Sequence, residues 1–282
     1  MFASRIGYES GITKLKSLSR RLTIATCLVC AFRMCACSHV AQSPFTGTWK
    51  TSPDQSEFSP LPFTFSLSNG RYDCTSCVPK VLQIKADGSE QPLPGLLHYK
   101  IAVNEIDSHT VRIINTRDGK GFSEEVCTAV NAAHTLHCKT TNHLPEDDKP
   151  LVGETEWERI GETIPNANAA SGSWRMQKWI LPADQSLKTF NWNGSDFTAS
   201  SPVGVRWTAK FDGKDYPVKG SYAIDSVSLR RTGDRAIEAT YKLGGHLIRV
   251  DKMTVSPDGK TLTTVSESEQ TGRVNTVLAI RQ

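Results

Sequence analysis

Short runs in which apolar and polar residues alternate fill the chain from about residue 45 to its end. Examples are residues 81–85 (VLQIK), 110–114 (TVRII), 226–230 (SVSLR) and 261–265 (TLTTV). Alternation with a period of two is typical of strands that bury one face. Asn-Gly and Asp-Gly pairs, which favour tight hairpin turns, separate these runs at 69–70, 87–88, 118–119, 193–194, 212–213 and 258–259. The pattern therefore predicts an all-β chain of short antiparallel strands.

This pattern is present twice. Gly47-Thr-Trp49 matches Gly172-Ser-Trp174, and the two tryptophans are 125 residues apart. Residues 85–95 match residues 210–220 at the same offset, with identities at Asp87/Asp212, Gly88/Gly213, Pro92/Pro217 and Gly95/Gly220. After a one-residue slip the match resumes at an offset of 126, at Val111/Ile237, Gly119/Gly245 and Thr135-Leu136/Thr261-Leu262. A constant offset over this length indicates a duplicated module.

Together these features predict two tandem antiparallel β-barrel-like domains of about eight strands each. The first domain is expected at residues 43–161 and the second at residues 171–282. Residues 162–170 between them are small, contain Pro and Asn, and show no periodicity, which is typical of an interdomain linker.

Residues 1–41 have the organisation of a signal peptide. Basic residues at 14, 16, 20 and 21 precede an apolar run at 22–32, and small residues follow it, with cleavage points after Ser38 or Ala41. The run is too short to span a bilayer. We therefore expect an exported protein, periplasmic or secreted. An alternative is an outer-membrane lipoprotein anchored through an acylated Cys37.

The net charge changes when this leader is set aside. The chain has a formal net charge of +4, of which residues 1–41 contribute +5, from six basic residues and one acid. The remaining chain therefore carries −1. This balance gives no support to binding of nucleic acid or of an anionic membrane.

Four cysteines follow the leader, and an even number in an exported chain favours disulfides. A four-residue turn at 131–134 places Cys127 directly opposite Cys138 on a hairpin, at the Cβ separation that a disulfide needs. The equivalent pair in the second repeat is Met253 with Thr264. Cys74 is then left to pair with Cys77, which closes a small loop.

Two other uses of the cysteines are less favoured. Cys74-Thr-Ser-Cys77 has the spacing of a thioredoxin-type redox pair, but it leads into a strand and lacks the helix N-terminus that lowers a thiol pKa. A metal site would need to combine His134, His137, Cys138 and His143. Neighbouring residues of a strand point to opposite faces, so His137 and Cys138 would diverge. No metal and no cofactor is predicted.

Catalytic motifs are equally weak. Glu154, Glu156 and Glu158 could suggest the carboxylate pair of a glycoside hydrolase. Three acids at a period of two on one strand are instead typical of a solvated sheet face. The chain has no Gly-x-Ser-x-Gly, no phosphate-binding glycine loop and no zinc-protease helix. No catalytic residue is therefore predicted, and a non-enzymatic protein is favoured.

The Gly-x-Trp at the start of each repeat resembles the opening strand of lipocalin-like (calycin) β-barrels. That resemblance implies that Trp49 and Trp174 each close a barrel end, and that a basic residue from a last strand covers each ring. Arg159 and Arg281, which end the first and second repeats, are the candidates. The chain also resembles uncharacterised two-repeat exported bacterial proteins, which implies no activity. Alternatively, both tryptophans are plain core residues of another β fold.

The function predicted first is non-enzymatic binding of a small apolar ligand inside one or both barrels. The second hypothesis is a structural or interaction module of the cell envelope, with barrels filled by side chains. The third is an exported hydrolase, which would need polar groups converging in a cleft.

Overall fold

The computed structural model describes residues 43–144, 147–202 and 204–282. The predicted signal peptide and the alternative lipid-anchor site at Cys37 lie outside these residues. The described chain consists of twenty strands and one short 3-10 helix, η1 (Pro53–Gln55). This confirms the prediction of an all-β protein. Among the described residues, no helix is long and apolar enough to cross a membrane.

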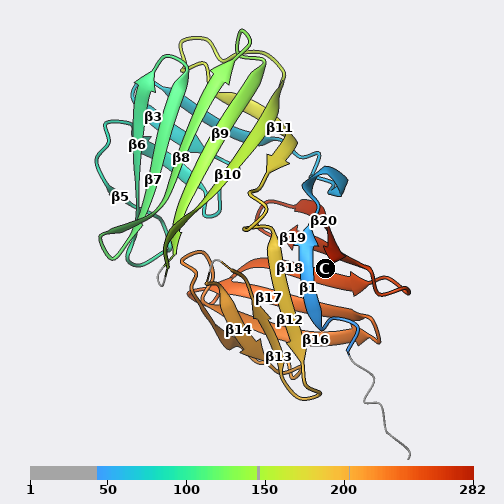
Figure 1. The fold of residues 1–282 in the computed structure, drawn as a ribbon. Helices are drawn as coiled ribbons and strands as arrows, with labels where there is room; N and C mark the ends of the chain where they lie inside the picture. The colour runs from blue at the N-terminus through green and yellow to red at the C-terminus, as the bar shows by residue number, and fades with distance from the viewer. Residues whose placement is uncertain (1–42, 145–146, 203) are drawn as a thin grey trace, which may run out of the picture. The chain divides into compact units, whose positions relative to one another are not determined.

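Ten strands form a closed antiparallel barrel, called the second barrel below (Figure 1). Its strands, in spatial order, are β1 (Gly47–Thr51), β12 (Leu187–Trp192), β13 (Phe197–Ser200), β14 (Arg206–Ala209), β15 (Tyr216–Lys219), β16 (Ser226–Gly233), β17 (Ala236–Leu243), β18 (His246–Val255), β19 (Thr261–Ser268) and β20 (Arg273–Arg281). Strand β17 shows why the sequence folds in this way, because Ile237, Ala239, Tyr241 and Leu243 are buried while the residues between them are partly exposed.

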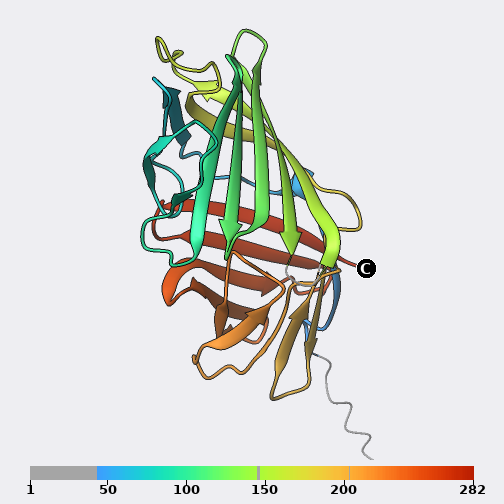
Figure 2. The ribbon, with the colours of Figure 1, turned by 90° about the vertical axis from the view of Figure 1, so that its left-hand side faces the viewer.

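The other ten strands form a barrel-shaped antiparallel sheet, called the first barrel below, whose two edge strands are β4 and β5. Their spatial order is β4 (Val81–Lys85), β3 (Arg71–Cys74), β2 (Phe63–Ser68), β11 (Gly172–Ile180), β10 (Asp147–Ile160), β9 (Thr135–Leu144), β8 (Lys120–Val130), β7 (Thr110–Arg117), β6 (Tyr99–Asp107) and β5 (Gln91–Pro92). The sheet curls so that Asp87, just after β4, forms an antiparallel bridge with Asn104 of β6. The long strands β7, β8 and β9 run side by side as a wall of this barrel (Figure 2).

Two barrels are therefore present, as predicted, with ten strands each in place of about eight. The additional strands are short. Strand β5 has 2 residues and β15 has 4. Segments of this length carry too few positions for an alternating pattern, so they could not be counted from the sequence.

The two repeats exchange their opening strands. Strand β1, at the start of the first repeat, pairs with β12 and β20 of the second barrel. Strand β11, at the start of the second repeat, pairs with β10 and β2 of the first barrel. Figure 1 shows β1 (blue) beside β12 (yellow). The boundaries 43–161, 162–170 and 171–282 remain a prediction about the repeat units, whereas each sheet draws strands from both sides of the linker.

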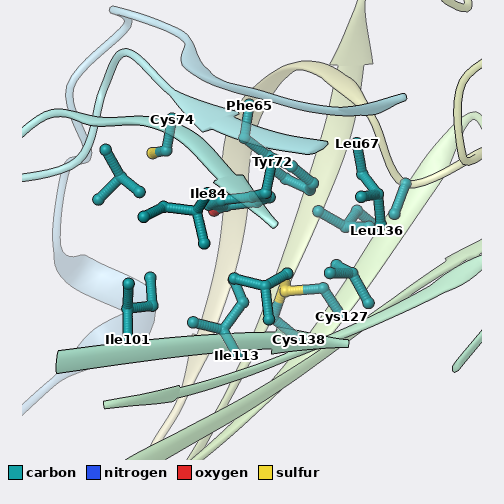
Figure 3. Packing of buried hydrophobic residues seen from close by; sticks show 14 of the residues in the cluster. Phe65, Leu67, Tyr72, Cys74, Ile84, Ile101, Ile113, Cys127, Leu136 and Cys138 are labelled. Atoms are coloured by element: carbon teal, nitrogen blue, oxygen red, sulfur yellow. A yellow bond between two sulfur atoms is a disulfide. The ribbon is translucent and has the colours of Figure 1, made fainter. Parts of the chain in front are cut away.

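Both barrels have apolar interiors. The first barrel buries Phe65, Leu67, Tyr72, Val103, Val111 and Leu136 around the Cys127–Cys138 disulfide (Figure 3). The second buries Trp49, Phe190, Phe197, Leu229, Ile237 and Val255. Apolar burial of about 25 cal/mol per Å² is the main source of stability for such interiors.

Both predicted disulfides are confirmed. Cys127 and Cys138 are register partners on β8 and β9, and their sulfur atoms are 2.01 Å apart. Met253 and Thr264 are partners in the equivalent hairpin. Cys74, the last residue of β3, is bonded to Cys77 at 2.02 Å. Both disulfides of the described residues lie in the first barrel, where they fix the β8–β9 hairpin and the turn after β3.

Candidate functional site

Each barrel contains a buried tryptophan that is covered by an arginine. In the first barrel, Trp174 is fully buried and the guanidinium carbon of Arg159 lies 4.1 Å from its ring centroid. In the second, Trp49 is fully buried and Arg281 lies at 4.2 Å. Such stacking contributes about 0.5–2 kcal/mol. Because the opening strands are exchanged, each ring is covered by the arginine of the other repeat.

These arginines donate hydrogen bonds through all three of their guanidinium nitrogens. The Arg159 guanidinium donates to three backbone carbonyl oxygens, at 2.5 Å to Ala133, 2.7 Å to Ser171 and 2.6 Å to Ala169. Arg281 donates to three carbonyl oxygens at 2.5–2.6 Å in the second barrel. Burial lowers the pKa of Arg159 below its ordinary value. Both guanidinium groups therefore hold the backbone around the tryptophan that they cover.

Steric constraints explain why the first residue of each Gly-x-Trp motif is a glycine. Gly47 has φ +140° and Gly172 has φ +147°, where a side chain is strained. A Cβ on Gly47 would also lie 2.6 Å from Nη1 of Arg281. A Cβ on Gly172 would contact Nη1 of Arg159 even more closely. The motif therefore leaves room for the guanidinium over the ring.

A cluster of polar side chains faces the interior of the second barrel. Lys188 of β12 is the register partner of the buried Trp49 on β1. Arg249 and Asp251 of β18 lie four and two residues before the buried Met253, on the same face of the strand. Residues that are opposite in an antiparallel pair, or two apart along a strand, share a face. These three charged side chains therefore project into the barrel.

Lys188, Arg249 and Asp251 are called the interior polar cluster below, and Asp251 is the main hydrogen-bond acceptor in it. It is 4% exposed, and its Oδ1 accepts hydrogen bonds from Nε of Arg249 at 3.1 Å and from Oγ of Ser266 at 2.6 Å. The Arg249 guanidinium also lies 4.5 Å from the ring centroid of Tyr241. Lys188 has no hydrogen bond or salt bridge to another described residue. One carboxylate thus neutralises Arg249, and Lys188 is left as the surplus cation.

The pKa shifts agree with this arrangement. Burial lowers the pKa of Lys188, the nearby Asp251 carboxylate opposes that shift, and the like charge of Arg249 adds to it. Burial and the Asp251 carboxylate both raise the pKa of Tyr241, so its hydroxyl stays protonated. The interior therefore presents a lysine, an arginine, a tyrosine hydroxyl and an aspartate side chain.

The two basic side chains of this cluster are more accessible than its acid. Lys188 is exposed although its strand position faces inward, and the Arg249 side chain keeps 38% of its surface accessible, against 6% for Asp251. Ser268, two residues beyond Ser266 on β19, adds a buried hydroxyl without a hydrogen-bond partner in the described chain.

The first barrel carries a related pair at the equivalent place. Glu125 is the register partner of Thr140, and Asp251 is the register partner of Ser266. Asp251 lies 126 residues after Glu125, and Ser266 lies 126 residues after Thr140. Thr140 Oγ1 donates a hydrogen bond to Oε1 of Glu125 at 3.4 Å. Burial raises the pKa of Glu125, and this hydrogen bond only partly offsets the rise. The first barrel therefore holds an acid without the basic partner that Asp251 has.

This acid predicts a pH-dependent stability. Glutamate titrates at about 4.3 in unfolded chains, so a raised native pKa stabilises the fold fully below that value and progressively less as the pH rises through the native pKa. Tyr72 and Thr140 are the polar groups beside it, and burial raises the pKa of Tyr72 well out of this range.

We expect the free energy of unfolding to fall, as the pH rises above about 4.3, more steeply in the wild-type protein than in Glu125→Gln, whose side chain does not titrate. Urea unfolding at several pH values measures both curves. Parallel curves would show that Glu125 keeps its ordinary pKa.

The other residues considered from the sequence do not converge. The described part of the chain holds one group of metal-ligand types, Glu125, Cys127 and Cys138, and its cysteines are joined in the disulfide, so neither offers a thiolate. His137 lies 3.9 Å from Glu156 on the outer face of the sheet. Glu158 accepts a hydrogen bond from Gln177 on the same face. The acids of β10 therefore lie outside the barrel.

A shallow surface groove lies outside the barrels, with a volume of about 400 Å³. It is lined by Pro53, Asp54, Ser56, Phe58, Glu156, Gln177, Lys178 and Trp179. Phe58 and Trp179 pack edge to face at 6.3 Å. Its acidic and basic groups are mixed, and none of them is buried, so it offers less for recognition than the interior of the second barrel.

The interior polar cluster was missed in the sequence, although a signal was present. In β18, Arg249 and Asp251 occupy the same parity as Met253 and Val255, which are core positions. Charged residues on a core-facing parity indicate a buried polar site. The offset of 126 also aligns Glu125 with Asp251, two acids at one position of the repeat.

Comparison with known proteins gives no relative. The chain matches no protein-family model, no curated protein and no solved structure.

Proposed function

We propose that this protein is an exported carrier or scavenger, and that its second barrel binds a small amphipathic molecule with one anionic group, such as a carboxylate. The observation that carries the proposal is the surplus positive charge of Lys188 and Arg249 over Asp251 in an otherwise apolar interior. An unpaired cation in a low-dielectric space is costly unless a ligand supplies the counter-charge.

The surrounding fold supports this ligand class. Phe190, Trp207 and Leu229 provide apolar surface for a hydrocarbon or ring, and Tyr241 offers a hydroxyl donor near the charged end. The resemblance of Gly-x-Trp to lipocalin-like barrels points the same way. The leader-like residues 1–41 and the two disulfides support an exported setting.

A fluorescent fatty acid tests the proposal. We expect saturable binding of one molecule of dansyl-undecanoic acid per chain, and at least a 10-fold weaker affinity in Lys188→Met, because a charge-assisted contact contributes about 1.5–3 kcal/mol. Lys50→Met is the matched control, since Lys50 is exposed and lies next to Trp49 on the outer face of β1.

Absence of saturable binding, or equal affinity in Lys188→Met and the wild-type protein, would contradict this function. A barrel filled by side chains, with a structural or interaction role in the cell envelope, would then be the better explanation.

A further inference from the structure

We propose that the first barrel is a second ligand site with the opposite charge preference, binding a hydrophobic amine with Glu125 as its counter-ion. This inference does not depend on the anionic ligand of the second barrel, because different residues in a different sheet carry it.

The first observation is the isolation of Glu125. It projects inward from β8, on the same face as the buried Cys127 and opposite Ile113 of β7. Its one recorded hydrogen bond is the 3.4 Å contact from Thr140, and no lysine or arginine of the described chain forms an ion pair with it. Its residue surface is nonetheless only partly buried, so a ligand can reach the carboxylate. An organic cation would supply the missing counter-charge.

The second observation is a row of four aromatic rings in the same barrel. Trp157 lies 5.6 Å from Phe63, Phe63 lies 5.9 Å from Phe65, and Phe65 lies 5.8 Å from Tyr72. Figure 3 shows Phe65 and Tyr72 together in this interior. Aromatic ring faces carry partial negative charge and attract ammonium groups, which is the basis of aromatic cages. Ring faces and one carboxylate together favour an amine over a neutral ligand.

Tyr72 ends the aromatic row, and the Glu125 carboxylate raises the pKa of its hydroxyl in addition to the effect of burial. The Arg273 guanidinium lies 5.2 Å from the Phe63 ring centroid and donates to the carbonyl oxygen of Pro62. Arg273 therefore covers the Phe63 part of the row, whereas Tyr72 is buried at the other end.

The third observation is the contrast between equivalent positions of the two barrels. Phe63 is the register partner of Trp174, as Lys188 is of Trp49. Phe63 thus occupies the position in the first barrel that Lys188 occupies in the second. Ser123 likewise precedes Glu125 by two residues, as Arg249 precedes Asp251. Both basic residues of the second barrel are therefore replaced in the first, while its acid is kept.

The strand wall beside Glu125 and Thr140 includes a glycine. Gly153 of β10 is the register partner of Thr140, where the second barrel has Asn275 opposite Ser266. The wall beside Glu125 therefore lacks a side chain that the second barrel has at this level.

Octylamine and octanol test the inference, because they differ only in the charged group. Titration of the protein at pH 7, followed by calorimetry, should give saturable octylamine binding at least 10-fold tighter than octanol binding. Glu125→Gln should remove this preference: the affinity for octylamine should fall at least 10-fold, and the affinity for octanol should not change. Glu154→Gln is the matched control, since Glu154 is exposed and belongs to the outward-facing set of β10.

Glu125→Gln keeps the size of the side chain, and its thermal unfolding is recorded to establish that the barrel is intact. Equal affinities for the amine and the alcohol, or an amine affinity unchanged by Glu125→Gln in a folded protein, would overturn the inference. So would equal weakening of amine binding by Glu154→Gln.

Discussion

A chain cleaved within residues 162–166 should remain a single particle in solution. These residues are exposed, so a protease site can be placed there. After cleavage, β1 of the N-terminal piece still lies between β12 and β20, and β11 of the C-terminal piece still lies between β10 and β2. Each exchanged strand also keeps a buried tryptophan in the other barrel. Burial of one tryptophan contributes about 4–6 kcal/mol, at about 25 cal/mol per Å² over about 150–250 Å².

Size-exclusion chromatography without denaturant measures this association, and both pieces are expected in one peak that denaturing electrophoresis separates. The same chain with the inserted site but without protease is the control. Elution of two separate pieces would contradict the exchange of strands.

A cysteine pair distinguishes strand exchange from contact between two self-contained halves. Oγ1 of Thr48 lies 3.0 Å from Oγ1 of Thr189 across β1 and β12. Thr48→Cys with Thr189→Cys should therefore join the cleaved pieces through a disulfide. If each repeat kept its own opening strand, Thr48 would take the place of Ser173 and face Thr64. Thr48→Cys with Thr64→Cys is thus the matched control, and it should form no cross-link.

The sequence could predict the barrels but not this exchange. Alternation and turn dipeptides are local signals, and they correctly predicted the strand type and the Cys127–Cys138 pairing. Strands β1 and β11 carry the same Gly-x-Trp, so each has the local features required by either barrel. Which sheet each one joins depends on the connections that follow it, and no periodic signal describes those connections.

The interior polar groups show a second limit to what can be predicted from the sequence. The parity of Arg249 and Asp251 on β18 is visible in the sequence, but parity alone does not place Lys188 of β12 near them. That proximity arises only when the closed sheet brings β12 and β18 around one interior. The 126-residue offset aligns Glu125 with Asp251 in the sequence, but only the strand registers place both acids in a barrel interior.

The two barrels thus share a frame and differ in their interior charge. The Trp–Arg closures are built alike in both, whereas the acid has a basic partner only in the second barrel. The disulfide Cys127–Cys138 lies two residues from Glu125 and makes the same hairpin more rigid in the first barrel. A duplicated frame with different interiors is suited to holding two chemically different ligands in one chain.

Loss of a closing arginine should be the most damaging single substitution. Arg159→Met removes three hydrogen bonds to backbone carbonyl oxygens and the stacking on Trp174. Each hydrogen bond from a charged donor contributes about 1.5–3 kcal/mol, and water can replace only part of them at a buried barrel end. We expect a fall of about 3–5 kcal/mol in the free energy of unfolding, measured by urea denaturation.

Arg175→Met is the matched control, because Arg175 is exposed and adjoins Trp174 on the outer face of β11. Its loss should change the free energy of unfolding by about 0.5 kcal/mol or less. Arg159→Lys should also be strongly destabilised, since an ammonium group cannot reproduce the planar fork that meets three carbonyl oxygens. If Arg159→Lys were as stable as the wild-type protein, positive charge alone would close the barrel, and the geometry of the guanidinium would not matter.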